Sequence, residues 1–163
     1  MVSPSANRWV IASAMACVFV LGTVWLGVPT YKKWQVDRLV DELCAKDGVV
    51  KVYEQVTLPA NSFDKFGAVT VMKRYETNSD SPFYYTSETT WILPEGKTLH
   101  SLDLYRSHYR LVRASDKKLL AEGVGYTRRG GDPIGPWHSS AYGCSAAADI
   151  SVLAAKVFVR NTN

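Results

Sequence analysis

An unbroken apolar run from Trp9 to Val28 dominates the pattern of hydrophobic and polar positions. These 20 residues carry no charge. At 1.5 Å per residue, a helix of this length spans about 30 Å, the hydrocarbon thickness of a bilayer. The run exceeds a usual signal-peptide core and ends in a poor cleavage site, Val28-Pro29-Thr30. We therefore predict an uncleaved transmembrane helix over 9–28, with interfacial aromatic residues near its ends: Trp9, Trp25, Tyr31 and Trp34.

A lipoprotein anchor is the alternative at this end of the chain. Residues 14–17 read Ala-Met-Ala-Cys, which resembles a lipoprotein cleavage site. However, eleven further residues of apolar character follow Cys17, and a mature lipoprotein would expose them. The uncleaved anchor is therefore favoured.

The orientation of the helix is decided by opposing signals. Positive charge alone slightly favours a cytoplasmic C-terminus, because Lys32, Lys33 and Arg38 follow the run and only Arg8 precedes it. The short tail over 1–8, the strand-rich aromatic character of the remainder and its two cysteines favour the opposite arrangement. We expect a bacterial inner-membrane protein with residues 1–8 in the cytoplasm and the C-terminal part in the periplasm.

Beyond Pro29, the spacing predicts an amphipathic linker helix over 29–48. Gly48 is a typical helix stop, and Pro29 predicts a bend between the two helices. The apolar stripe either binds a partner or covers the domain's own sheet, and the second interpretation is favoured. Its members recur at i, i+3, i+4 and i+7: Val36, Leu39, Val40 and Leu43.

Strand patterns follow the second helix. Residues 50–58 alternate with period two, and further strand-like segments cover 68–75, 83–93, 99–113 and 119–129. The alternation slips near Leu104-Tyr105, which predicts a bulge there. Gly123 and Gly125 share one face of their strand, so that a bulky side chain or another backbone can approach closely.

The end of the chain has two interpretations. Ile150, Leu153, Ala154 and Val157 have helical spacing after Asp149, a plausible N-cap, whereas 157–159 also fit a final strand. The fold class predicted is α+β: an N-terminal transmembrane helix, an amphipathic helix, an antiparallel β-sheet and a short C-terminal helix. The periplasmic domain would cover 49–163.

Three cysteines are present. Cys17 lies inside the apolar run, which leaves Cys44 and Cys144 as a pair. In an oxidising compartment they would form one disulfide, and in the cytoplasm they would remain thiols. A metal site would need further ligands at short spacing, and His100, His108 and His138 do not supply them. No metal or cofactor is therefore expected.

The segment 128–138 is the candidate partner-binding region. Its glycines and prolines lack the pattern of a phosphate loop, and they could simply build a rigid surface loop. It nevertheless gathers cationic, acidic, aromatic and imidazole side chains of the kinds that anchor protein interfaces: Arg128, Arg129, Asp132, Trp137 and His138.

Catalysis and nucleic-acid binding have weak support. Cys44 with His138 would be a nucleophile and base without any family signature, so no enzyme activity is predicted. Residues 31–163 hold every acidic residue and every Lys and Arg except Arg8, so their net charge is one unit below the chain's +4, with no basic block. Aromatic residues of the strands are expected mostly in the core: Tyr84, Tyr85, Trp91, Tyr105, Tyr109 and Tyr126.

Two stretches, 38–48 and 126–138, resemble segments of uncharacterised small bacterial single-pass inner-membrane proteins with a periplasmic domain. The resemblance covers a minor part of the chain. It implies the location but no activity, ligand or catalytic residue.

Three hypotheses follow. The first is a non-enzymatic, membrane-anchored accessory protein whose periplasmic domain binds another envelope protein. The second is a phage- or mobile-element-encoded envelope immunity or exclusion protein. The third is a small subunit of a larger inner-membrane complex, although Gly22 and Gly27 lack the spacing of a small-xxx-small motif.

Overall fold

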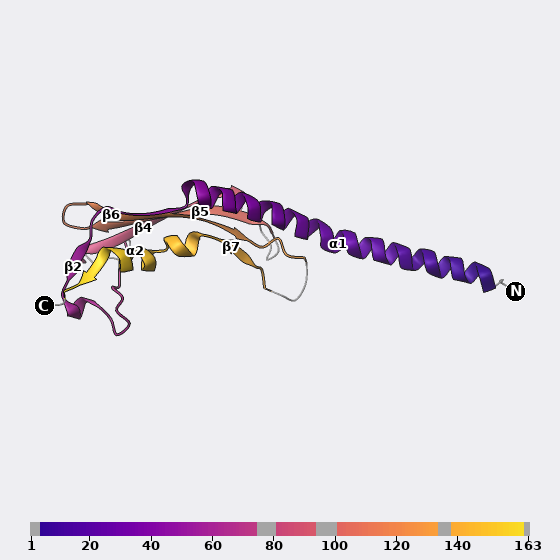
Figure 1. Cartoon of the computed structure of the whole chain (residues 1–163), viewed down its shortest axis with the longest axis horizontal. Helices are drawn as coiled ribbons and strands as arrows, with labels where there is room; N and C mark the ends of the chain where they lie inside the picture. Colours follow the sequence, from indigo (N-terminus) through magenta and orange to yellow (C-terminus); the bar gives the residue numbers. More distant parts are fainter. Residues whose placement is uncertain (1–3, 75–80, 94–100, 134–137, 162–163) are drawn as a thin grey trace.

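A computed structural model describes residues 4–74, 81–93, 101–133 and 138–161, with side chains described from residue 11 onward. A long helix, α1 (Pro4–Asp47), extends away from a sheet-based domain at its N-terminal end and lies across that domain at its C-terminal end (Figure 1). The short helix α2 (Ile150–Val157) covers the opposite face of the sheet. The fold is α+β, as the sequence predicts.

Helix α1 is continuous through Pro29, so the chain forms one helix where the sequence predicts two. Proline removes one backbone donor, yet helices in apolar surroundings tolerate it where nearby Ser or Thr hydroxyls satisfy the backbone. Here Pro29 leaves the Trp25 carbonyl without its usual backbone donor, and the Thr30 hydroxyl donates to the neighbouring carbonyl of Leu26 at 2.7 Å. The transmembrane prediction and the linker prediction therefore cover two parts of one helix.

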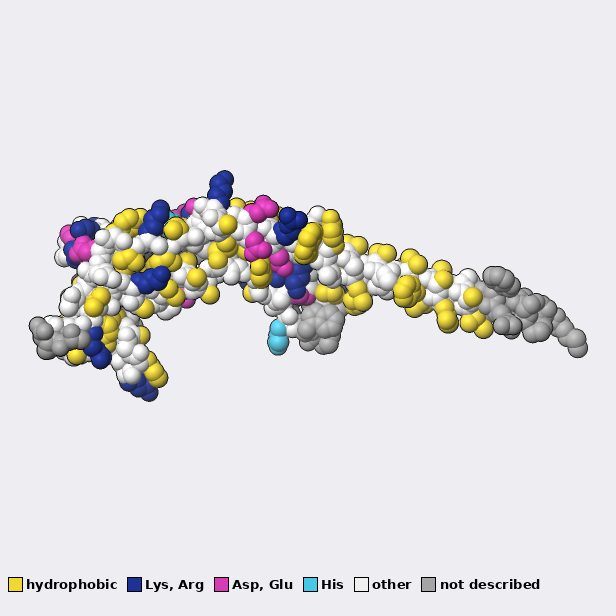
Figure 2. Space-filling view, in the orientation of Figure 1, with side chains coloured by type: hydrophobic (Ala, Val, Ile, Leu, Met, Phe, Trp, Pro, Cys, Tyr) yellow, Lys and Arg dark blue, Asp and Glu magenta, His cyan; other side chains and the backbone are white. Residues whose placement is uncertain are grey.

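The two parts of α1 differ in their surroundings. Phe19, at 72% exposure, and Leu21, at 68%, are exposed. Figure 2 shows no charged side chain on the coloured part of α1 that extends beyond the domain. Among the described residues, α1 is the one helix long and apolar enough to cross a membrane, a property that signal sequences share. The C-terminal part instead packs on the sheet.

The main sheet has six strands in the order β1-β6-β5-β4-β3, and β7 also pairs with β6. A separate pair joins β2 to β8. The strand bounds are β1 Val49–Val52, β2 Val56–Leu58, β3 Met72–Lys73, β4 Phe83–Leu93, β5 Asp103–Arg113, β6 Leu119–Arg129, β7 Ala141–Gly143 and β8 Phe158–Arg160. Two short 3₁₀ helices, η1 (Ala60–Ser62) and η2 (Ser145–Ala148), complete the fold.

The sheet is mixed rather than antiparallel throughout. Pairing is antiparallel among β4, β5 and β6, as predicted, but β3 runs parallel to β4, and β2 runs parallel to β8. The predicted strand over 50–58 divides because Tyr53 and Glu54 both donate their backbone N–H groups to the carbonyl of Leu120. The chain then leaves the main sheet and pairs with β8.

The predicted bulge lies at the expected level but in the neighbouring strand. Trp91 pairs with Tyr105 and Leu93 pairs with Leu104, so the extra residue is Ile92 of β4. Both interpretations of the chain's end are correct. Asp149 caps α2 by accepting a hydrogen bond from the backbone N–H of Ile150, and β8 follows the helix directly.

Each face of the sheet has its own hydrophobic core. Under α1, Val40, Leu104, Val124 and Tyr126 are buried, with Val36 and Leu43 packed against them. This confirms that the apolar stripe of α1 covers the domain's own sheet, although Leu39 is 38% exposed. On the opposite face, α2 supplies much of the second core: Leu111, Leu120, Ala121, Leu153, Ala154, Val157 and Phe158.

Gly123 and Gly125 permit close approach, as their shared face predicts. The backbone of η2 lies directly against them, so a Cβ atom would overlap the Ala148 carbonyl oxygen or the Ser145 Cα. The absence of side chains at these two positions lets η2 pack on β6. The chain that follows Cys144 is thereby held against the sheet.

We predict that Gly125→Ala destabilises the domain by about 1–3 kcal/mol, because the backbone of η2 must move to admit the methyl group. Chemical denaturation of the full chain in detergent micelles, followed by circular dichroism, measures the change. Gly27→Ala is the control, since no atom lies within 4 Å of its Cβ position. Equal stability of Gly125→Ala and the wild type would show that η2 does not depend on this contact.

Candidate functional site

Three polar side chains of α1 connect the helix to the sheet region, and we call this set of contacts the helix–sheet joint. Lys33 pairs with Asp132 at 2.6 Å, Asp37 pairs with Arg128 at 2.6 Å, and Asp41 accepts a hydrogen bond from the Tyr142 hydroxyl at 2.8 Å. The three helix residues are spaced by four, which places them on one side of a helix. The joint therefore fixes the rotation of α1 about its own axis.

Arg128 is the most buried member of the joint, with only 2% of its side chain exposed. Its Nε donates to Asp37, and its Nη1 donates to the Gly130 carbonyl, to the Ser140 carbonyl and to the Ser140 hydroxyl. These partners satisfy a cation that would be costly to bury alone. Sequence reasoning placed Arg128 on a partner-binding surface, whereas the structure places it inside the protein.

Asp132 also belongs to the joint. Its carboxylate accepts hydrogen bonds from the Ser140 backbone N–H at 2.6 Å and from the Ser140 hydroxyl at 3.0 Å, besides its ion pair with Lys33. Burial acts to raise the pKa of Asp132, but Lys33 and the hydrogen bonds from Ser140 outweigh it and lower the pKa to about 2. Asp132 is thus held ionised at neutral pH.

The last turn of α1 has two further attachments. The structure brings Cys44 and Cys144 into a disulfide, with their sulfur atoms 2.06 Å apart. Asp47 accepts hydrogen bonds from the Tyr126 hydroxyl at 2.7 Å and from Arg106 Nε at 3.3 Å, and its pKa is lowered chiefly by the bond from Tyr126. The helix is therefore attached to the sheet along its whole C-terminal part.

Arg129 has the opposite environment to its neighbour. Its side chain is 47% exposed, while its Nη2 donates to the buried carboxylate of Asp103 at 2.9 Å. The guanidinium also lies over the ring of Trp91, 5.9 Å from the ring centroid. Trp91 in turn meets Tyr105 edge to face, with 5.1 Å between their centroids. Arg129 is therefore part of a surface cluster of aromatic and cationic groups.

We call this surface the Trp91–Arg129 patch. It comprises Trp91, Tyr105 and Arg129 together with Ile92, the exposed bulge residue beside Trp91. Trp91 is 37% exposed and Ile92 is 42% exposed. Sequence reasoning expected Trp91 in the core, and only the register of β4, β5 and β6 places these residues together. The bulge signal near Tyr105 was the one indication of special geometry there.

The remaining predicted residues are less informative. His138 is exposed, and Trp137 lies outside the described residues. Cys44 is bonded to Cys144, so its sulfur is not a free nucleophile for the weighed pairing with His138. Within the described ranges, no group of three or more His, Cys, Asp or Glu side chains is placed to hold a metal ion.

A second polar cluster, which sequence reasoning missed, lies on the α1 face of the sheet beyond the end of the helix. Glu122 accepts a hydrogen bond from the Tyr53 hydroxyl at 2.5 Å and lies 3.2 Å from His108 Nε2. The bond from Tyr53 is the main cause of the lowered pKa of Glu122. Glu122 and His108 belong to adjacent strands, so this cluster serves cross-strand pairing.

Comparisons with family models, with curated proteins and with solved structures find no match to this chain. The candidate site therefore rests on its own geometry. Of the five residues predicted to bind a partner, Arg128 and Asp132 build the joint, and Arg129 lies in the exposed patch. His138 is exposed without a described role.

We predict that Asp132→Asn lowers the free energy of unfolding by about 2 kcal/mol at pH 7. The pKa of Asp132 is lower in the folded chain than in the unfolded chain, so its contribution is present above pH 4 and disappears as the pH falls toward 2. Denaturation at pH 7 and at pH 2.5 measures the difference between wild type and variant, which should shrink at the lower pH.

Glu42→Gln is the matched control, because Glu42 lies exposed on the outer face of α1. It should leave stability nearly unchanged at both pH values. A pH-independent loss in Asp132→Asn would mean that the ion pair with Lys33 is not the source of the effect.

Proposed function

We propose that this protein is a non-enzymatic accessory protein of the bacterial inner membrane, whose periplasmic domain binds another envelope protein. The observation that carries the proposal is the continuity of α1 together with the helix–sheet joint. A helix that could cross the membrane runs without interruption into the domain and is attached to it at five levels, from Lys33 to Asp47. The domain is therefore presented in one orientation relative to the helix.

This attachment sets the height of the Trp91–Arg129 patch. Arg129 follows Arg128, which pairs with Asp37, nine residues beyond Val28. Nine helical residues span about 14 Å. The patch thus lies within roughly 15 Å of the end of the apolar run, measured along the helix. At that height it would meet a partner that is itself embedded in the membrane or lies against it.

The chemistry of the patch supports protein recognition. Trp, Tyr and Arg are enriched among the residues that dominate binding energies at interfaces. Arg129 is held in place by Asp103 and stacks on Trp91, so little side-chain freedom would be lost on binding. Confinement to the membrane would also raise the effective concentration of both proteins, so a small contact area would suffice.

We predict that Ile92→Asp abolishes capture of the partner. The substitution places a carboxylate in the patch without removing the contacts among Trp91, Tyr105 and Arg129. The measurement is photo-cross-linking in intact cells from an unnatural amino acid at Thr89, followed by mass spectrometry. Thr89 is exposed and lies two residues before Trp91, on the same face of the strand. Cross-links present in the otherwise native chain should be lost in the Ile92→Asp chain.

Phe66→Asp is the matched control. Phe66 is an exposed apolar residue, at 83% exposure, in the segment between η1 and β3. Both substitutions should leave the stability of the domain within about 0.5 kcal/mol of the wild type. Cross-links that persist in Ile92→Asp, or that disappear equally in Phe66→Asp, would contradict the assignment of the patch.

The compartment has its own test. A periplasmic domain would hold Cys44 and Cys144 oxidised in growing cells, so that a thiol-alkylating reagent labels them only after reduction. We predict this protection, measured as a gel shift in a Cys17→Ala chain, in which the two remaining cysteines are the disulfide pair. Immediate labelling of both cysteines would place the domain in the cytoplasm and refute the periplasmic part of the proposal.

A further inference from the structure

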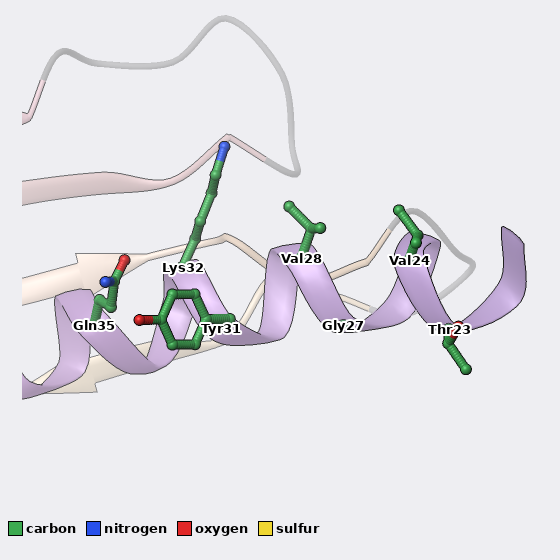
Figure 3. A pocket seen from close by; sticks show the side chains of 7 residues that line it. All are labelled: Thr23, Val24, Gly27, Val28, Tyr31, Lys32 and Gln35. Carbon is green, nitrogen blue, oxygen red and sulfur yellow. The ribbon is translucent and has the colours of Figure 1, made fainter. Parts of the chain in front are cut away.

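A shallow groove runs along α1 where its apolar part ends. Figure 3 shows its lining side chains: Val24, Val28 and Lys32 extend to the same side of the helix, whereas Thr23 points the other way. Tyr31 and Gln35 lie two residues from Lys33 and Asp37, a rotation of about 200° around the helix. Tyr31 and Gln35 therefore face away from the sheet, whereas Lys32, at the edge of the groove, also lies beside Leu102, Gly131 and Asp132. Its lining residues are Thr23, Val24, Gly27, Val28, Tyr31, Lys32 and Gln35.

The groove changes character along its length. Its N-terminal part is formed by Thr23, Val24, Gly27 and Val28, within the apolar run, and its C-terminal part is formed by Tyr31, Lys32 and Gln35. Gly27 has no side chain, and no atom lies within 4 Å of its Cβ position, so the surface of the groove is open there. An apolar floor that leads to a cationic, hydrogen-bonding rim matches a molecule with a hydrocarbon tail and an anionic head.

The rim has unused binding capacity. Lys33 is engaged by Asp132, whereas the neighbouring Lys32 is exposed and has no ion pair among the residues described. In Figure 3 the Lys32 side chain extends away from the helix axis. The Tyr31 hydroxyl and the Gln35 amide likewise have no hydrogen bond within the described part of the chain. All three can donate hydrogen bonds, which is the requirement for holding a phosphate group.

We propose that this groove binds an anionic phospholipid. One acyl chain lies along Val24, Gly27 and Val28, and the headgroup phosphate accepts hydrogen bonds from Lys32, Tyr31 and Gln35. The inference rests on the proposed function, because it requires α1 to stand in a membrane. It goes further by naming a ligand class and the residues that select it. Such a lipid would hold Lys32 at the depth of the headgroups.

A lipid fits the groove better than a second transmembrane helix does. A helix packed against Gly27 would bring its own apolar side chains toward the rim, where the Lys32 ammonium would lose water without gaining an anion. Near an anionic membrane surface each lysine contributes about 1 kcal/mol of attraction. Charge complementarity therefore favours the lipid, and the helix is kept as the competing outcome.

Native mass spectrometry of the full chain tests the proposal. The chain is released from mixed micelles that contain equal amounts of phosphatidylglycerol and phosphatidylcholine. We expect the wild type to retain one phosphatidylglycerol in preference to phosphatidylcholine. Lys32→Gln should reduce that preference about fivefold, the ratio that follows from the attraction of one lysine. Lys46→Gln, at the far end of α1, is the matched control and should not change it.

A second variant tests the groove rather than its charge. Gly27→Leu fills the floor and should reduce retention of both lipids while leaving Lys32 in place. Equal retention of the two lipids by the wild type, or an unchanged preference in Lys32→Gln, would overturn the proposal. A partner helix that cross-links to the groove in the wild type but not in Gly27→Leu, while lipid retention stays intact, would also overturn the proposal. That result would assign the groove to a helix.

Failure of this inference differs from failure of the proposed function. Alkaline extraction of membranes that express the full chain shows whether α1 anchors the protein at all. Extraction of the chain into the soluble fraction would refute the membrane anchor, and with it the lipid site. A chain that resists extraction but shows no preference for phosphatidylglycerol refutes the lipid site alone.

Discussion

Burial of the Arg128 guanidinium under α1 is the constraint on which the arrangement of helix and sheet depends. A cation that is 2% exposed requires a carboxylate and hydrogen-bond acceptors at fixed positions. Asp37 supplies the carboxylate from the helix, and the Gly130 and Ser140 carbonyls supply the acceptors from the chain after β6. A helix turned or shifted by one residue would leave this charge unpaired, so the interaction selects one register among the many that the apolar stripe alone would permit.

Other contacts between helix and sheet, on both sides of Asp37 along α1, favour the same register. Lys33 and Asp132 act toward the N-terminal side, and Asp47 with Tyr126 acts toward the C-terminal side. The disulfide between Cys44 and Cys144 adds a covalent connection in the same region. Polar pairing thus specifies the geometry, while Val40 and its neighbours in the core contribute the hydrophobic stabilisation. Because the arrangement of α1 on the sheet is fixed, the position of the Trp91–Arg129 patch relative to the helix is fixed too.

Local patterns predicted local structure well, and long-range pairing was beyond them. The apolar run, β4, the N-cap at Asp149 and the closeness required at Gly125 all depend on residues near one another in sequence, so the pattern contains them. The burial of Arg128 depends on Asp37, 91 positions away, and no periodicity shows that pairing. Trp91 lies on β4, whereas η2 and α2 pack mainly on β1, β5 and β6. Its exposure therefore depends on where these distant elements pack. The parallel pairing of β2 with β8 likewise joins distant segments that each appear as an ordinary short strand.

Because α1 is continuous through Pro29 and attached to the sheet, the helix and the domain would tilt together as one rigid unit. Transmembrane helices tilt by about 20° on average, and the angle follows bilayer thickness. A sheet of 11-residue strands is about 37 Å long. Without a hinge between helix and sheet, a tilt of 20° would move the far end of such a sheet sideways by roughly 13 Å. For a helix anchored in the membrane as proposed above, a change in bilayer thickness would thereby displace the far end of the domain.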